Sequence, residues 1–333
     1  MIKPAASQMS LSAELDDNAH EVLVSVIVPV YNEAPVLDAF HARLSSTLNQ
    51  LEGMQSEVLY IDDGSTDESF AKLEAIHSHD VRVGLVRLSR NFGKESALSA
   101  GLDLARGQAV VVIDADLQDP PELIIDMMNV WREGADVVNM RRISREGETL
   151  FKRFTAHFFY RVMNRLSDVP VAQDVGDFRL LSRRAVDALN TLPERCRFMK
   201  GLYAWIGFHQ VTLNYFREPR HAGITKWKYW KLWNYALDGI TSFSTGPLKV
   251  SMYLGLVSSL AAFFSGVYFM VKAIVYGDPV PGFPTLIVAV LFLGGLQLVA
   301  VGIVGEYVGR LFHETKARPK YILDQVKAPQ EHK

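Results

Sequence analysis

The chain has 333 residues, 49% of them hydrophobic, and its 35 basic and 37 acidic residues leave a net charge of −2. This near balance gives no general argument for binding nucleic acid, which a strongly basic chain would give. The one cysteine, Cys196, excludes an internal disulfide framework and fits a reducing compartment. Acidic and mixed residues gather early and long apolar runs come late, so the composition already separates two kinds of segment.

The first 20 residues are polar and acidic, and no basic stretch leads into an apolar one. We therefore expect a disordered N-terminus without a cleavable signal. Beyond them, short apolar runs alternate with helical patterns, which predicts an α/β domain with a doubly wound, mainly parallel sheet. The runs that we expect to be strands are 22–30, 57–62, 81–88, 110–113 and 135–140.

The segment Val110–Glu122, VVVIDADLQDPPE, places three acids after a strand that we expect to be buried on both faces. Asp114 and Asp116 are two residues apart, so on an extended backbone their carboxylates point to the same side. Two such oxygen ligands suit Mg²⁺ or Mn²⁺ that carries a phosphate-bearing substrate. The alternative is a turn whose acids cap the next helix, and Asp119 fits that role. For an Asp pair on an apolar strand we favour the metal.

A second acidic turn, DDGSTD at 62–67, follows the strand 57–62, and a polar stretch also follows the strand 81–88. Because the carboxyl ends of parallel strands share one edge of a sheet, these turns predict a nucleotide-type site. The chain has neither a G-x-G-x-x-G nor a Walker sequence, so the site is not of the Gly-rich phosphate-loop type. Lys94 and Glu95 fit the solvated start of a helix.

Two stretches combine aromatic and basic residues. In 150–166, apolar residues recur at helical spacing among Lys and Arg, which fits either a core helix with a basic rim or a helix in a membrane interface. In 226–235, KWKYWKLWNY, a tryptophan recurs at every third residue among lysines. Trp and Tyr mixed with Lys is typical of the lipid headgroup layer, so we predict an interfacial helix there.

Two apolar runs, Ser251–Val271 and Phe283–Gly305, contain no charge. Each is long enough to cross about 30 Å of hydrocarbon, so they predict a transmembrane hairpin with spans at 251–272 and 283–305. The alternative, two buried helices of a soluble protein, fits uncharged runs of this length poorly. Basic residues flank both ends of the hairpin, so the positive-inside rule places both ends and the α/β domain in the cytoplasm.

Five motifs together resemble glycosyltransferase family 2: PVYNE at 29–33, DDGSTD at 62–67, LSRNFGKESAL at 88–98, DADLQDPPE at 114–122 and GDFRLLSR at 176–183. Within that family the chain is similar to the polyprenyl-phosphate glycosyltransferases with two C-terminal membrane spans, such as the bactoprenol glucosyltransferases and dolichol-phosphate mannose synthase. The stretch 305–322, GEYVGRLFHETKARPKYI, is similar to the bacterial members. The likeness covers residues 22–323.

The resemblance implies a GT-A fold, which is a Rossmann-like, mostly parallel sheet domain, and inverting transfer with Mg²⁺ or Mn²⁺. It implies a nucleotide-sugar site formed by Pro29, Tyr31, Glu33, Asp63 and Asp114. It also implies a metal site at Asp116 and Gln118, and Asp116 and Asp177 as the catalytic pair. An R-x-x-G-x-[ST]-K pattern next to the membrane implies an acceptor-phosphate site at Arg220, Thr225 and Lys226, with Arg141 as a further candidate. The chain lacks the Q-x-x-R-W sequence of processive members, which favours transfer of a single sugar.

These inferences divide the chain into five parts. They are a disordered N-terminus at 1–20, a GT-A catalytic domain at 21–217, interfacial helices at 218–248, the hairpin at 249–306 and a cytoplasmic tail at 307–333.

We therefore expect metal-dependent transfer of one sugar, with glucose from UDP-glucose as the first choice, onto polyprenyl (undecaprenyl) phosphate at the cytoplasmic face of the inner (plasma) membrane. A metal at Asp116 would stabilise charge on the leaving diphosphate. A phosphate acceptor is already mostly ionised at neutral pH, so Asp177 need only orient the sugar.

Two alternative functions stay open. One is a membrane glycosyltransferase that acts on a glycolipid hydroxyl, for which Asp177 is an essential base. The other is a catalytically inactive, nucleotide-binding membrane scaffold. We further expect a homo-oligomer, because Gly294, Gly295 and Gly302 offer small surfaces for helix packing, and no nucleic-acid partner.

Overall fold

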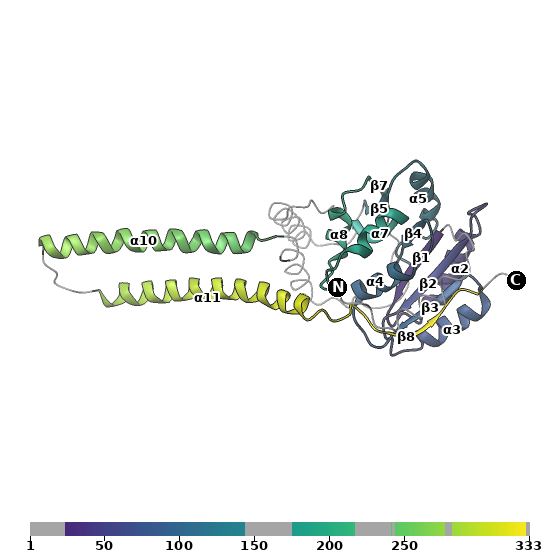
Figure 1. Cartoon of the computed structure of the whole chain (residues 1–333), viewed down its shortest axis with the longest axis horizontal. Helices are drawn as coiled ribbons and strands as arrows, with labels where there is room; N and C mark the ends of the chain where they lie inside the picture. Colours follow the sequence, from purple (N-terminus) through teal and green to yellow (C-terminus); the bar gives the residue numbers. More distant parts are fainter. Residues whose placement is uncertain (1–23, 144–174, 217–240, 242–243, 277–281, 331–333) are drawn as a thin grey trace. The chain divides into compact units, whose positions relative to one another are not determined.

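The computed structural model describes residues 24–143, 175–216, 241, 244–276 and 282–330 (Figure 1). These residues fall into two compact units: a sheet-and-helix unit, to which 319–330 also belongs, and a helical unit that ends at residue 318. The predicted N-terminus at 1–20, the amphipathic stretch 150–166 and most of the predicted interfacial helices at 218–248 lie outside the described residues.

The first unit contains an eight-stranded sheet in the order β7-β5-β6-β4-β1-β2-β3-β8. β1 pairs in parallel with β2 and β4, β2 with β3, and β5 with β7, whereas β6 and β8 run antiparallel to their neighbours. The predicted α/β class with a mostly parallel sheet is therefore confirmed. The strands are β1 (Val24–Val30), β2 (Ser56–Asp62), β3 (Val83–Leu88), β4 (Ala109–Val112), β5 (Val137–Arg142), β6 (Val175–Ser182), β7 (Gln210–Tyr215) and β8 (Leu323–Lys327).

Helices pack on both faces of this sheet, and β1 shows why. Its side chains alternate between the faces, so Val26 and Val28 join Phe40 of α2 in one core cluster. Ile27 points to the other face and meets α4, where a Cβ on Gly101 would lie 2.3 Å from the Ile27 side chain. Glycine at 101 thus lets α4 lie close against the sheet. The helices are α2 (Leu37–Leu48), α3 (Ser69–His79), α4 (Lys94–Leu104), α5 (Leu123–Arg132), α7 (Arg183–Thr191) and α8 (Met199–Trp205).

The strand β8 closes the β3 edge of the sheet, in a stretch for which the sequence suggested no strand. Two side-chain contacts fasten this segment to neighbouring helices. The Tyr321 hydroxyl donates to Asp103 of α4 at 2.8 Å, and Lys327 pairs with Glu74 of α3 at 2.6 Å. An uncovered strand edge invites pairing with other chains, so β8 protects the sheet as well as extending it.

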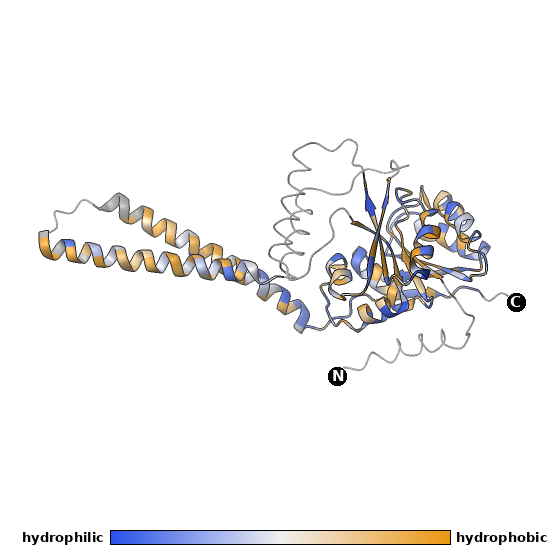
Figure 2. Ribbon diagram, turned by 90° about the horizontal axis from the view of Figure 1, so that it is seen from above, coloured by the Kyte–Doolittle hydropathy of each residue, from blue (hydrophilic) through white to orange (hydrophobic). Residues whose placement is uncertain are grey.

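The second unit holds two long helices, α10 (Gly246–Tyr276) and α11 (Phe283–Thr315), which extend beyond the predicted spans. Each is long and apolar enough to cross a membrane, and Figure 2 shows hydrophobic residues along both. Phe264, Leu291 and Leu298 are 66%, 69% and 74% exposed, so these helices do not form the core of a soluble protein. Apolar surface of this extent suits hydrocarbon, which supports the predicted hairpin.

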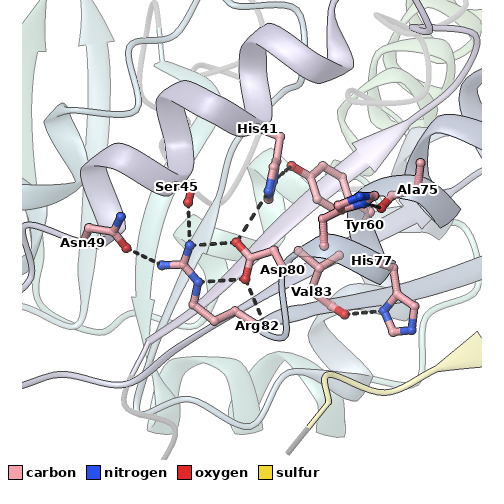
Figure 3. Close-up of polar contacts among 10 residues, drawn as sticks. His41, Ser45, Asn49, Tyr60, Ala75, His77, Asp80, Arg82 and Val83 are labelled. Atoms are coloured by element: carbon pink, nitrogen blue, oxygen red, sulfur yellow. Dashed lines mark hydrogen bonds and ion pairs between the residues drawn. The ribbon is translucent and has the colours of Figure 1, made fainter. Parts of the chain in front are cut away.

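A polar network joins α2, β2 and the turn before β3, away from the strand ends that carry the acidic motifs (Figure 3). Asp80 pairs with Arg82 at 2.7 Å and lies 3.5 Å from Nε2 of His41, whose Nδ1 is 3.1 Å from the Tyr60 hydroxyl. Further donors of Arg82 bind the side chains of Ser45 in α2 and of Asn49, the residue that follows α2. An open groove of about 540 Å³ lies over the network. Because these polar groups pair with one another, the network braces the fold.

Burial lowers the pKa of His41 below its usual 6.5, although Asp80 opposes this. The unfolded chain therefore binds a proton at this residue where the folded chain does not, so the folded state loses stability as the pH falls below 6.5. We expect the unfolding midpoint of the wild type to fall more between pH 7 and pH 5 than that of His41→Gln.

Scanning calorimetry of the full chain in detergent measures this difference. The matched control is His79→Gln, because His79 is exposed and its ring bonds the Ala75 carbonyl of its own helix. The control should keep the wild-type pH dependence. A His41→Gln variant with the same pH dependence as the wild type would contradict the prediction.

Candidate active site

Four loops meet at the carboxyl ends of the parallel strands β1 to β4, which is where open α/β sheets bind ligands. They span 31–36, 63–68, 89–93 and 113–122. These loops, the end of β1 with Pro29 and the start of β6 with Asp177 contain every predicted nucleotide, metal and catalytic residue. The motif residues therefore lie together at the carboxyl ends of the strands, which is where the sequence placed them.

The loops after β1 and β2 are bonded to each other. Asn32 has a left-handed backbone (φ 53°), and its side-chain oxygen accepts the N–H of Thr66 at 2.8 Å. The N–H of Glu33 donates to the Ser69 hydroxyl at 2.9 Å. These bonds hold the predicted nucleoside residues Tyr31, which is 39% exposed, and Glu33 beside the β2 loop.

Asp63 ties the β2 loop to the β3 loop. Its carboxylate accepts the N–H groups of Phe92 at 2.7 Å and Gly93 at 2.9 Å. Burial raises the pKa of Asp63 against the effect of these bonds. The neighbouring Gly64 has φ 67°, and a Cβ there would lie 2.5 Å from the backbone carbon of Arg90, so only glycine fits this turn. A contact of Asp63 with a nucleoside stays a prediction.

Lys94 joins two of the predicted site acids. Its ammonium lies 2.6 Å from a carboxylate oxygen of Asp114 and 2.5 Å from one of Asp177. Asp177 reaches this place because β6 runs antiparallel to β4, which puts the start of β6 at the end of β4. Lys94 is exposed and begins α4, as expected, but it also pairs with two acids of the site, which the sequence did not predict.

These ion pairs decide which groups are charged. Burial opposes the charge of Lys94, but Asp114 and Asp177 outweigh it and raise the pKa of Lys94. Burial also opposes the charge of Asp177, yet Lys94 and Lys200 hold the pKa of that carboxyl well below its usual range. Asp177 is therefore ionised at neutral pH, and a carboxylate held in this way is a poor proton acceptor.

The turn after β4 carries the predicted metal ligands. β4 ends at Val112, so Asp114 and Asp116 lie in a turn and not on the extended strand that the sequence analysis assumed. Leu117 is left-handed (φ 59°), and the N–H of Gln118 donates to Asp116 at 3.1 Å. Within the described part of the chain, no group of three or more His, Cys, Asp or Glu is arranged to hold a metal. An ion at this turn would need further oxygens from a substrate, as Mg²⁺ usually does.

Asp119 does not cap the next helix, as the alternative interpretation of this segment supposed. It is buried and accepts a hydrogen bond from the Tyr215 hydroxyl. Arg142 donates to the same hydroxyl at 3.2 Å and lies 3.9 Å from Asp119. A Cβ on Gly176 would lie 2.9 Å from the Arg142 guanidinium, so this arginine packs against Gly176 at the start of β6.

The two arginines of β5 thus have different surroundings. Arg141, the one singled out from the sequence, donates to Asn214 at 2.8 Å in an exposed pair. Arg142 is the one that packs against the start of β6, and the sequence analysis missed it. The predicted acceptor residues Arg220, Thr225 and Lys226 lie outside the described residues.

The family model of glycosyl transferase family 2 matches residues 25–189, and that of the GtrB C-terminal hairpin matches 246–311. A protein of Synechocystis described as an uncharacterized glycosyltransferase is 49% identical over 91% of this chain and 95% of its own. The chain belongs to glycosyltransferase family 2. A prophage bactoprenol glucosyl transferase homolog of Escherichia coli is 44% identical over 91% of this chain and 99% of its own.

Among solved structures, a glucosyl-3-phosphoglycerate synthase of Mycobacterium tuberculosis superposes with a TM-score of 0.45 at 22% identity, over 72% of this chain and 83% of that one. No ligand is transferred from it to this chain. The family match confirms the predicted resemblance, the GT-A fold class and the assignment as a glycosyltransferase.

Replacing Lys94 with Met removes the cation between Asp114 and Asp177 while keeping the length of the side chain. The two carboxylates would then repel each other and the negatively charged donor. We expect sugar transfer to fall by about tenfold or more, because fixed charges next to the reacting groups contribute most of the stabilisation in such sites. Initial rates of labelled-sugar transfer by the full chain in detergent measure the loss.

The control for this experiment is Lys72→Met, since Lys72 pairs with Asp38 at 2.5 Å between α2 and α3. It should stay within about twofold of the wild type, as surface ion pairs contribute little. A Lys94→Met enzyme as active as the control would refute the role given to the bridge.

Proposed function

We propose that the chain transfers one glucose residue from UDP-glucose to a polyprenyl phosphate at the cytoplasmic face of the inner membrane, with inversion. The observation that carries this proposal is the combination of an acid-lined site on a glycosyltransferase sheet and an exposed apolar hairpin in one chain. Such a chain suits one soluble and one lipid substrate. The relatives named as bactoprenol glucosyl transferases support glucose as the sugar and bactoprenol as the lipid.

The donor would lie along the loops after β1, β2 and β4, with the nucleoside at Pro29, Tyr31, Glu33 and Asp63 and the diphosphate near Asp114. Asp116 and Gln118 supply a carboxylate and an amide oxygen, a donor set that fits Mg²⁺ or Mn²⁺ when a diphosphate provides further oxygens. A bound ion would neutralise the charge that develops on the leaving diphosphate.

The charge of Asp177 supports a phosphate as the acceptor. A hydroxyl acceptor needs a base with a pKa near the working pH, whereas Lys94 and Lys200 hold the pKa of Asp177 far below it. A phosphate monoester, whose second pKa is about 6, arrives already ionised. Asp177 would then orient the sugar hydroxyls, and the alternative of a glycolipid hydroxyl is disfavoured.

The acceptor phosphate would meet basic side chains at the membrane. Arg220, Thr225 and Lys226 stay the proposed contacts, with Arg141 as predicted and Arg142 added because it packs beside the start of β6. Arginine binds a phosphate through two parallel bonds and lysine as a point charge.

The membrane topology is part of the proposal. Lys249 precedes the first apolar segment, and Arg310, Lys316, Arg318 and Lys320 lie at or beyond the end of the second, which favours cytoplasmic termini. Gly294, Gly295 and Gly302 have nothing within 4 Å of the place a Cβ would take, so they leave open faces for a second copy of the hairpin.

A transfer assay with the full chain in detergent tests the function. Labelled UDP-glucose, GDP-mannose and UDP-N-acetylglucosamine are offered with and without polyprenyl phosphate, in Mg²⁺, Mn²⁺ or EDTA. We expect an organic-soluble labelled product from UDP-glucose that requires both lipid phosphate and metal. Asp116→Asn should lower the rate by about 100-fold or more, since it removes the carboxylate from the proposed metal.

Each failure of this assay has its own meaning. A product from another donor corrects the sugar, and a product that survives EDTA removes the metal from the proposal. Nucleotide binding without any turnover would favour the inactive scaffold.

A further inference from the structure

Glu95 is an acid of the site to which the proposed function gives no role. It follows Lys94 in the first turn of α4, and its carboxylate accepts the N–H of Met199, the first residue of α8, at 3.3 Å. The two residues are 104 positions apart in the sequence. Glu95 therefore links the helix that carries the bridging lysine to a helix that lies beyond Asp177 in the chain.

Charged groups from three elements surround Glu95. Lys94 on α4 and Lys200 on α8 favour its ionised form, whereas Asp177 on β6 opposes it. Lys200 also acts on Asp177, and Lys94 bonds Asp177 directly. Lys94 and Lys200 thus act on both acids, Asp177 and Glu95.

Tyr203 gives a second observation at the same place. It is 1% exposed, its ring lies 3.7 Å from the Arg179 guanidinium carbon, and both Glu95 and Asp177 act on its charge. Its hydroxyl has no hydrogen-bond partner in the part of the chain that the structure describes. Burying a hydroxyl without a hydrogen-bond partner costs free energy of folding. The polar groups around Glu95 and Asp177 therefore include one unsatisfied donor, the Tyr203 hydroxyl.

Stability of α4 does not explain Glu95. An acid in the first turn of a helix normally stabilises it, because its charge complements the helix dipole. Burial and Asp177 instead raise the pKa of Glu95 to about 7, so folding disfavours the charge that this stabilisation needs. Residues whose pKa is shifted by burial and by a charged neighbour concentrate at functional sites.

We propose that Glu95, which bonds the first residue of α8, is a positioning residue that shares Lys94 and Lys200 with Asp177 and so leaves the Asp177 carboxylate free to bond the donor sugar. The inference rests on the proposed function, in which Asp177 orients that sugar. With Glu95 ionised, both lysines are shared between two acids. With Glu95 neutral, both act on Asp177 alone and leave it less free to bond the sugar hydroxyls.

Glu95→Gln tests the charge, because glutamine keeps an oxygen for the Met199 N–H. We expect kcat at pH 8 to fall about tenfold while KM for the donor stays within about twofold, the pattern of an interaction made in the transition state. The wild type should gain activity as the pH rises through 7, and this gain should shrink in the variant. Ionisation of the acceptor phosphate also gives a pH effect, but that effect persists in both proteins.

Two further variants separate charge from fold. Glu74→Gln removes a helical glutamate that pairs with Lys327 outside the site, and it should match the wild type. Glu95→Asp keeps the charge on a shorter side chain, so it should restore the pH dependence even where kcat stays low. Hydrogen exchange of residues 198–206 should be the same in the wild type and Glu95→Gln.

Equal kcat and equal pH profiles in the wild type and Glu95→Gln would overturn the inference. So would a loss of UDP affinity in the variant, because Glu95 would then act on donor binding. Failure of the wild type to glycosylate any polyprenyl phosphate refutes the proposed function instead. Hydrolysis of the donor without an acceptor then decides the role of Glu95, since that reaction also needs the sugar to be oriented.

Discussion

The ion pairs of Lys94 with Asp114 and Asp177 are the interaction on which the site depends. Acids gathered at one sheet edge repel each other and any diphosphate that approaches, so the arrangement requires a cation. Lys94 supplies one from the helix after β3, and the antiparallel β6 brings Asp177 within its reach. The antiparallel direction of β6 is therefore what brings Asp177 to the carboxyl end of β4, beside Lys94.

A second constraint comes from the apolar hairpin, which in the sequence is an insertion into the sheet domain. The chain leaves that domain after β7 and returns to it as β8, which pairs with β3 at the opposite edge of the sheet. The hairpin is thus joined to the catalytic domain through two covalent connections. The proposed lipid and nucleotide substrates would therefore be bound by two parts of one chain.

The sequence predicted what depends on local pattern, namely the buried strands, the acidic turn at 62–67 and the acids at strand ends. It missed what depends on contacts between distant segments. Lys94 is exposed, as its sequence context suggested, and only the fold brings it to Asp177, 83 positions away. Arg142 and Asp119 pair with each other and share the Tyr215 hydroxyl, and β8 is a short, half-polar edge strand with little periodicity to detect. Predicting any of these contacts would have required the order of the strands in the sheet.

The charge states of Asp177 and Glu95 also bear on the choice of acceptor in the proposed function. Asp177 is held ionised by two lysines, which makes it a weak base. Glu95 has a pKa near 7 that would suit a base, but its carboxylate bonds the amide of Met199. Neither acid is set to take a proton from a hydroxyl. A nucleophile that arrives already ionised needs no such base, and a phosphate carried on a membrane lipid satisfies both this requirement and that of the apolar hairpin.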